Sequence, residues 1–262
     1  MNMALLNTLI TPIGENLSTQ EIQIQQIATA NRITSPFIDA GGLAVATKLD
    51  SSISRTTIVA NNLATTNSFL QTQDGVLETA SNIVDRIGQL KAMSEGIFGD
   101  NTGAYQTEFE VLSEQLSNLT GEQFNGVDIF SNAGDTLTVI SNETGTATFE
   151  VDQSDLENAV SDITAEPNLV NLAMDSITDS LQNIANLRAS NGAQQSQILA
   201  AFDLMQVNNS SLNVAYSSII DVDYARTITD LALASVQGEA GISVFSNALT
   251  TATTVDNLLL DL

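Results

Sequence analysis

Residues 41–96 read GGLAVATKLDSSISRTTIVANNLATTNSFLQTQDGVLETASNIVDRIGQLKAMSEG, a stretch without proline. Nearly every seventh residue, counted from Leu49, is apolar, while Ser, Thr, Asn, Gln and Asp fill most other positions. We call these seventh positions the stops of a heptad stripe. The stops are Leu49, Thr56, Leu63, Leu70, Leu77 and Val84. Such a heptad stripe is typical of a helix that packs along another helix. The pattern therefore predicts one helix of about 55 residues, with a length of about 80 Å.

A second stripe with the same spacing lies near the other end of the chain. Its stops are Ile177, Ile184, Asn191, Ile198, Met205, Leu212 and Ile219. Two long amphipathic helices bury such stripes most simply against each other. A compact chain of 262 residues would have a radius of gyration of only about 18 Å. The sequence therefore predicts a mainly α fold, an elongated rod of long antiparallel coiled-coil-like helices.

The composition argues against several classes of function. The chain has no Cys and no His, so it has no thiolate nucleophile, no imidazole base and none of the usual zinc ligands. Its 31 acidic and 7 basic residues give a formal charge of −24, and the basic residues are too scattered to form a nucleic-acid-binding stripe. No apolar run approaches the length of about 18 residues that a membrane span needs. We expect no enzyme, cofactor, metal, nucleic acid or membrane insertion; an enzyme would need a cleft of converging carboxylates.

The acidic residues are concentrated in the middle of the chain. Residues 74–166 contain 18 Asp or Glu against Arg86 and Lys91, a net charge of −16, whereas residues 1–33 have a net charge of −1. An acidic middle suits a solvated outer face, and a nearly neutral apolar terminus suits burial against copies of itself. Ordinary surface solubility is the alternative explanation of the acidic middle.

The spacing of apolar residues, together with proline and turn residues, predicts the remaining helices and strands. The expected helices cover residues 3–33, 105–119 and 156–163, then one that opens at Pro167 and one that follows Asp223. Runs rich in β-branched residues at 136–140 and 146–151 flank a turn and predict a β-hairpin.

Both terminal helices have apolar faces that one chain cannot cover. The residues expected to carry self-assembly are Leu5, Leu9, Ile13, Ile24, Ile27, Ile242, Phe245, Leu249 and Leu259. Gly238 and Gly241 make the last helix weak on its own. We therefore predict that these two helices pair with each other and with neighbouring subunits, so that they fold on assembly.

Segments in both halves of the chain resemble bacterial flagellins. Residues 31–49, NRITSPFIDAGGLAVATKL, resemble the N-terminal signature of that family, and residues 122–126, EQFNG, resemble its Phe-Asn-Gly turn. Residues 220–226, IDVDYAR, and 236–242, VQGEAGI, resemble its C-terminal segments. The matched signature residues are Arg32, Asp39, Gly41, Gly42, Leu43, Phe124, Asn125, Gly126, Asp221 and Asp223.

The resemblance implies a structural subunit that polymerises into a hollow helical flagellar filament for motility. Its implied partners are further copies of itself, the flagellar export apparatus and its chaperone, and the cap and junction proteins. The implied location is extracellular. The N-terminus has no positively charged region and no clear cleavage site, so we expect export without a cleavable signal peptide.

The resemblance also implies three domains. Residues 1–42 and 221–262 would form an inner terminal coiled-coil domain. Residues 43–130 and 166–220 would form a helical rod, and residues 131–165 a small β-hairpin or outer segment.

Contacts of an innate immune receptor are a further implication of the resemblance, at Arg86, Leu90 and Glu108. Gly88 and Gln89 stand where the family has an Arg and a Glu. The heptad pattern offers another interpretation, in which Leu90 is buried in the seam and Arg86 is solvated.

Asp221 and Asp223 also have two interpretations. They could chelate a cation, or they could cap the N-terminus of the last helix.

Two other functions fit parts of the pattern. The helices also resemble the hook–filament junction protein, and residues 128–130, DIF, echo a segment of that family. The segments at 40–44 and 237–241 favour flagellin instead. A monomeric acidic coiled-coil adaptor or adhesin is the alternative from another class.

Overall fold

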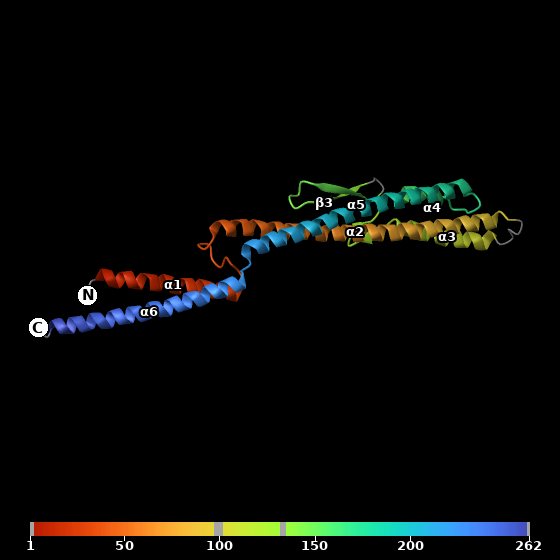
Figure 1. Cartoon of the computed structure of the whole chain (residues 1–262). Helices are drawn as coiled ribbons and strands as arrows, with labels where there is room; N and C mark the ends of the chain where they lie inside the picture. Colours follow the sequence, from red (N-terminus) through yellow and green to blue (C-terminus); the bar gives the residue numbers. More distant parts are fainter. Residues whose placement is uncertain (1–2, 97–101, 132–134, 261–262) are drawn as a thin grey trace. The chain divides into compact units, whose positions relative to one another are not determined.

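The computed structural model of the chain describes residues 3–96, 102–131 and 135–260. Most of these residues are helical, and the strands are short (Figure 1). The elements in chain order are α1 (Met3–Thr29), α2 (Ala40–Ser94), α3 (Thr102–Leu119), β1 (Gln123–Phe124), β2 (Val127–Asp128), β3 (Thr136–Ile140), β4 (Thr148–Asp152), α4 (Leu156–Thr164), α5 (Met174–Ile220) and α6 (Tyr224–Leu260). The expected fold class is confirmed: mainly α, with long antiparallel helices, a small β-hairpin region and paired terminal helices.

The chain divides into two compact units. Unit 1 contains residues 1–52 and 211–262, and unit 2 contains residues 53–210. The terminal helices α1 and α6 belong to unit 1, while α2 and α5 each give their longer part to unit 2. Each unit has its own cluster of buried apolar side chains.

The core of unit 2 is the seam between α2 and α5. Both heptad stripes are buried there, at Thr56, Leu63, Leu70, Leu77, Val84, Ile177, Ile184, Asn191, Ile198 and Met205. Polar contacts beside the seam show that the helices are antiparallel, because Asn209 Nδ2 donates to Thr57 Oγ1 at 2.7 Å and Arg188 binds Asp74. The seven-residue spacing therefore predicted the seam correctly.

Two short helices and the β region cover the seam. Phe109 and Leu116 of α3 and Leu156 and Val160 of α4 are buried in the same core cluster. Strands β3 and β4 form an antiparallel hairpin in which Thr136 pairs with Asp152 and Ile140 with Thr148. The second strand begins two residues later than the sequence suggested, because residues 146 and 147 donate backbone N–H groups to the Asn142 side chain within the turn.

The expectation that Pro167 opens the second long helix is wrong. Helix α5 begins at Met174, and the chain before it is irregular. Gln106 of α3 holds this segment, since its Oε1 accepts from the N–H of Leu169 at 2.9 Å and its Nε2 donates to the Pro167 carbonyl at 2.7 Å. Leu169 and Leu172 are buried in the core. These tertiary contacts outweigh the local preference of proline for a first helical turn.

Unit 1 is built differently. Helices α1 and α6 pack against each other in antiparallel orientation, as contacts of Gln20 with Ala234 and of Ile13 with Gly241 show. The buried apolar cluster of this unit is small. It consists of Ile33, Ala46 and Ile220, with Leu43, Tyr216 and Ile219 packed against it.

Candidate assembly surface

The α1–α2 loop pairs with the turn between α5 and α6 inside unit 1. The Arg32 N–H donates to the Ile220 carbonyl at 2.6 Å, and the Val222 N–H donates to the Ala30 carbonyl at 3.0 Å. Ala30 adopts the left-handed conformation, with φ of 61°, directly after α1 ends. Such a residue is a common end of a helix. Backbone hydrogen bonds therefore join the chain just after α1 to the chain just before α6.

The Arg32, Asp39 and Gly42 residues of the signature form one contact network. Asp39 Oδ1 accepts from the Gly42 N–H at 2.7 Å and so caps the N-terminus of α2. Asp39 Oδ2 accepts from Arg32 Nη2 at 3.1 Å, and Arg32 Nε donates to the Ile219 carbonyl at 3.0 Å. A Cβ at position 42 would collide with the Asp39 carboxylate. The network thus explains why a glycine follows the Asp at this spacing. Gly41 and Leu43 lie in the same first turn of α2.

The residues of the other two signature segments also have structural contacts. Asn125 and Gly126 both have positive φ, 52° and 80°, as the tight turn between β1 and β2 requires. The Phe124 ring packs edge-on against Phe69, with centroids 6.0 Å apart. Asp223 Oδ1 accepts from the Arg226 N–H at 3.2 Å and caps α6.

Asp221 forms a β-bridge with Asn31. Within the described residues, no group of three or more carboxylates lies close enough to hold a metal ion.

Glycine residues of α6 and amide side chains of α1 allow the two helices to lie close together. Gln20 Nε2 donates to Asn16 Oδ1 at 2.6 Å and across the pair to the Ala234 carbonyl at 3.1 Å. A Cβ at Gly238 would lie 2.8 Å from Asn16 Oδ1, and one at Gly241 would lie 3.2 Å from Ile13. These glycines weaken α6 as an isolated helix, but they also leave room for α1.

Much of the apolar surface of this pair remains in solvent. Among the side chains of α1 and α6 that the structure describes, ten large ones are between 44% and 66% exposed. They are Ile10, Leu17, Ile24, Tyr224, Ile228, Leu233, Val236, Ile242, Val244 and Leu249, and we call them the assembly surface. The buried residues of α6 are Thr227, Ala234 and Gly238, and α1 has none among its described side chains.

The predicted assembly residues lie on more than one face of this pair. Ile24, Ile242 and Leu249 are exposed, whereas Ile13, Ile27 and Phe245 are half-buried. The side chains of Leu5, Leu9 and Leu259 lie outside the described residues. Sequence reasoning did not single out Leu233, Val236 and Val244, because α6 is apolar on most faces and its pattern does not rank them.

The predicted receptor-contact residues are divided between surface and core. Arg86 Nε donates to Glu108 Oε1 at 2.7 Å, and both side chains are partly exposed. This hydrogen bond, followed by the charge of Glu108, raises the pKa of the Arg86 guanidinium. Leu90 is completely buried. A Cβ at Gly88 would lie 3.3 Å from Ile177, so α5 passes close to this position.

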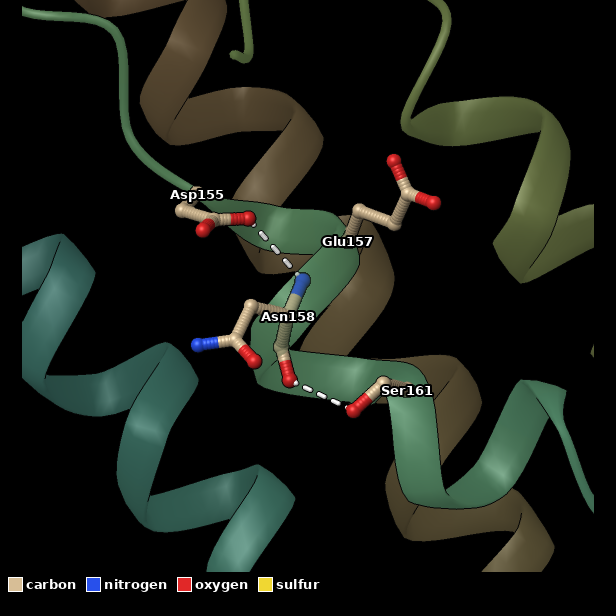
Figure 2. Close-up of a pocket in the computed structure, with 4 residues that line it drawn as sticks. All are labelled: Asp155, Glu157, Asn158 and Ser161. Atoms are coloured by element: carbon tan, nitrogen blue, oxygen red, sulfur yellow. Dashed lines mark hydrogen bonds between the residues drawn. The ribbon is translucent and has the colours of Figure 1, made fainter. Parts of the chain in front are cut away.

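A separate pocket lies at the N-terminus of α4 (Figure 2). Its lining residues are Asp155, Glu157, Asn158 and Ser161. Asp155 Oδ1 accepts from the Asn158 N–H at 2.9 Å, and Ser161 Oγ donates to the Asn158 carbonyl at 2.9 Å. Asp155 therefore caps the N-terminus of α4, and both hydrogen bonds lie within this end of the helix. The polar side chains that line the pocket thus have a structural role.

The fold and the exposed pair define a class: a long-helix structural subunit whose two ends meet in a pair with uncovered apolar faces. Residues 1–135 match the family model of the bacterial flagellin N-terminal helical region, and residues 174–259 match that of the C-terminal helical region. The chain belongs to the bacterial flagellin family, the structural subunits of the flagellar filament.

Curated relatives cover nearly the whole chain. A flagellin from Halalkalibacterium halodurans is 25% identical and aligns over 90% of both chains. A flagellin from Listeria innocua is 26% identical over 86% of both. A flagellar filament 31.3 kDa core protein from Treponema maltophilum is 25% identical over 94% of both.

A solved structure shares the fold. The putative flagellar hook-associated protein from Vibrio parahaemolyticus superimposes with a TM-score of 0.60, over 70% of this chain and 100% of that one. The sequences are 12% identical, so this likeness concerns the fold alone. Among the described residues, no helix is long and apolar enough to cross a membrane.

Proposed function

We propose that this flagellin polymerises through its α1–α6 pair into a hollow helical filament that serves motility. The observation that carries the proposal is the assembly surface, ten large apolar residues on two helices that bury little between them. Exposed apolar surface on this scale marks a site of association. Copies of the same chain are the occupants that the family implies.

The energetics favour assembly over a free pair. Burial of one Leu, Ile or Val side chain contributes about 1.5–3 kcal/mol. In a single chain, α1 and α6 gain this term at few positions, so the ordering of the two helices depends on what covers them. Contacts between two different faces of each copy propagate without closing, and that geometry produces a filament. Binding of neighbours then stabilises the pair by mass action.

The proposed domain organisation follows the family. Residues 1–42 with 221–262 form the inner domain, residues 43–130 with 166–220 form the rod, and residues 131–165 form a small outer segment. The division of the chain near residues 52 and 210 supports this organisation. Compared with the proposed bounds at 42 and 220, the division lies about ten residues later in α2 and about ten residues earlier in α5. The signature network around Asp39 would then lie at the base of the inner domain.

The proposed location is extracellular, in the flagellum, after export without a cleavable signal peptide. The proposed partners besides further copies are the export apparatus, its chaperone, and the cap and junction proteins. For an innate immune receptor, the exposed Arg86–Glu108 pair is the accessible element, while Leu90 offers no surface. These proposals rest on family membership.

A junction protein of the hook and filament is the second candidate. The fold likeness to a putative hook-associated protein is compatible with this alternative. Such a protein would bind a filament end without elongating it. An acidic adaptor would remain monomeric.

Electron microscopy of the purified chain, seeded with sonicated filaments, tests the proposal. We expect long filaments from the intact chain and none after deletion of residues 1–30 or 235–262. The double variant Leu17→Ser/Ile242→Ser should raise the critical concentration at least about tenfold, because each lost burial exceeds the 1.4 kcal/mol of one decade.

Val111→Ser is the matched control, since Val111 is an equally exposed apolar residue on α3 of unit 2. Its critical concentration should stay within about twofold of the parent. Normal filaments from either deletion, or from the double variant at the parental concentration, would refute the proposal. Short end-bound caps would favour the junction protein.

A further inference from the structure

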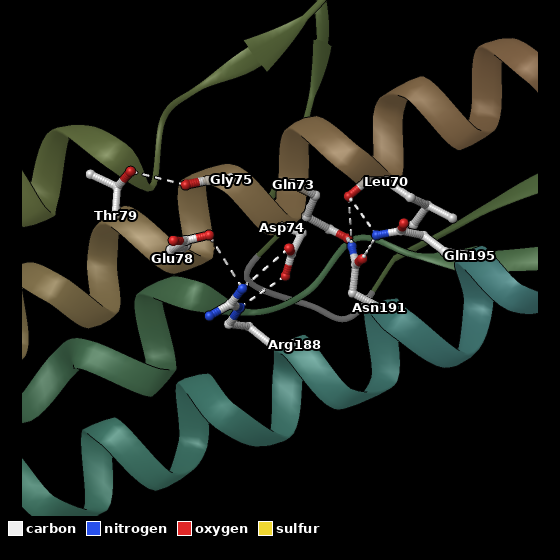
Figure 3. Close-up of polar contacts among 9 residues, drawn as sticks. All are labelled: Leu70, Gln73, Asp74, Gly75, Glu78, Thr79, Arg188, Asn191 and Gln195. Carbon is white, nitrogen blue, oxygen red and sulfur yellow. Dashed lines mark hydrogen bonds and ion pairs between the residues drawn. The ribbon is translucent and has the colours of Figure 1, made fainter.

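Three carboxamide side chains interrupt the apolar seam of unit 2 (Figure 3). Gln73 of α2 and Asn191 of α5 are buried, and Gln195 of α5 is half-buried. Asn191 occupies a stop of the second heptad stripe, where the neighbouring stops Ile184 and Ile198 are apolar. A polar residue at such a position usually sets register at a cost in stability.

The three amides form a relay in which each donates to the next. Gln195 Nε2 donates to Asn191 Oδ1 at 2.5 Å, and Asn191 Nδ2 donates to Gln73 Oε1 at 2.6 Å. Gln73 Nε2 then donates to the Ile129 carbonyl at 2.9 Å and the Asp152 carbonyl at 3.4 Å. Each side-chain oxygen of Gln73 and Asn191 thus has a donor, and each amide nitrogen has an acceptor.

The Leu70 carbonyl strengthens the crossing from α5 to α2. It accepts from Asn191 Nδ2 at 3.1 Å and from Gln195 Nε2 at 3.5 Å, beside its bond within α2 (Figure 3). The relay therefore binds backbone as well as side chains, and it does so at one level of the seam.

We propose that this relay locks the register of α2 against α5 within unit 2. The apolar stops recur every seven residues, so a slip of seven residues, about 10 Å, would leave most apolar contacts replaced by equivalent ones. The same slip would place Asn191 beside Leu77 and Ala80, whose side chains form no hydrogen bond, or beside Leu63 and Thr66, whose single hydroxyl replaces one partner at most. The bonds that Asn191 and Gln195 donate across the seam to Gln73 and to the Leu70 carbonyl would then be lost, and a buried polar group left without its partner carries a desolvation penalty.

The ion pairs beside the seam contribute less to this choice. Arg188 binds Asp74 and Glu78, but these side chains are between 33% and 60% exposed. Exposed ion pairs contribute little and are screened by salt. The buried amides therefore dominate the discrimination between registers.

The relay also ties the β region to the helix pair. Its last two acceptors, Ile129 and Asp152, lie just after β2 and at the end of β4. Gln194 of α5 adds two reciprocal bonds with Asp152, at 3.1 Å and 2.8 Å. Because Gln73 lies on α2 and Gln194 on α5, a change of register would leave the hairpin attached to only one of the two helices. This lock belongs to the single chain and does not depend on polymerisation.

Distance measurement by pulsed electron paramagnetic resonance tests the lock. The chain contains no Cys, so Thr79→Cys and Gln197→Cys place two spin labels at exposed positions of α2 and α5 without further changes. The parent should give one narrow distance. Gln73→Leu/Asn191→Leu should add a second population shifted by up to about 10 Å, the length of one heptad. Its urea midpoint should stay at or slightly below that of the parent, because apolar groups replace buried amides but the Ile129 and Asp152 carbonyls lose their donor.

The matched control is Gln182→Leu/Asn186→Leu, which removes an exposed amide pair from the same helix. It should keep the single distance.

A single unshifted distance in the folded double apolar variant would overturn the proposal. If that variant does not fold, Gln195→Leu removes only the first donor of the relay. It must then broaden the distance distribution, and an unchanged distribution in Gln195→Leu would equally overturn the lock.

Discussion

Unit 1 and unit 2 are both built from paired amphipathic helices, but only unit 2 closes on itself. Among the residues that the structure describes, α3, α4 and the β region cover the seam of α2 and α5 in unit 2, and 26 apolar residues are buried in one cluster. In the described part of unit 1, no further helix or strand covers α1 and α6, and the buried apolar cluster contains three residues. The proposed function assigns two roles to this difference: unit 2 would be stable as a single chain, and unit 1 would be completed by other copies.

The largest expected effect comes from the seam of unit 2. Leu70→Ala should lower the free energy of unfolding of the monomer by about 2–5 kcal/mol, because it leaves a cavity at a fully buried position. Leu17→Ala on the assembly surface should change it by no more than about 0.5 kcal/mol. Urea denaturation followed by circular dichroism measures both. Equal losses would mean that the terminal pair is as well packed as the seam.

The signature network should show an intermediate effect, confined to unit 1. Gly42→Ala forces the Asp39 carboxylate away from the N-terminus of α2, so the cap and the bond to Arg32 are both disturbed. Loss of a cap costs about 0.5–2 kcal/mol. Hydrogen exchange should become faster in the first turn of α2 and stay unchanged in the seam of unit 2. Gly75→Ala is the matched control, because a Cβ there meets no atom within 4 Å.

The smallest effect is expected at the exposed ion pair of unit 2. Hydrogen bonding to Asp74 is the main cause of the raised pKa of Arg188. A raised pKa means that the contribution is fully present below the pKa of the unfolded guanidinium and is lost only as pH rises through the folded pKa, in strongly alkaline solution. Arg188→Gln should therefore destabilise the monomer by less than about 1 kcal/mol, equally at pH 6 and pH 9. A loss that differs between these two pH values would contradict this assignment.

The two units also differ in what the sequence could predict. The seam followed from local spacing, since Leu63, Leu70 and Leu77 repeat every seven residues and helical geometry places them on one face. The start of α5 could not be found in this way. The segment before Met174 is held by Gln106, a residue far away in the sequence whose role depends on tertiary packing.

The sequence predicted that the terminal helices carry an assembly surface, but it did not predict all of the residues that are exposed there. Apolar terminal helices indicated an assembly surface, but Leu233 and Val236 were missed because α6 is apolar on most faces. Asn191 is a polar stop in the second stripe, but nothing near Gln73 in the sequence identifies these two residues as partners. A buried hydrogen bond between residues far apart in the sequence can be recognised from the sequence only where its polar residue interrupts an apolar repeat.

The most direct test is hydrogen exchange of the intact chain, measured by mass spectrometry before and after polymerisation. The account predicts that amides of α1 and α6 exchange rapidly in the monomer and become protected at least about a hundredfold in the filament, as burial between copies stabilises them. Amides of the α2–α5 seam in unit 2 should be protected in both states. Terminal helices that are already as protected in the monomer as the seam would contradict the account, because unit 1 would then be complete without its neighbours.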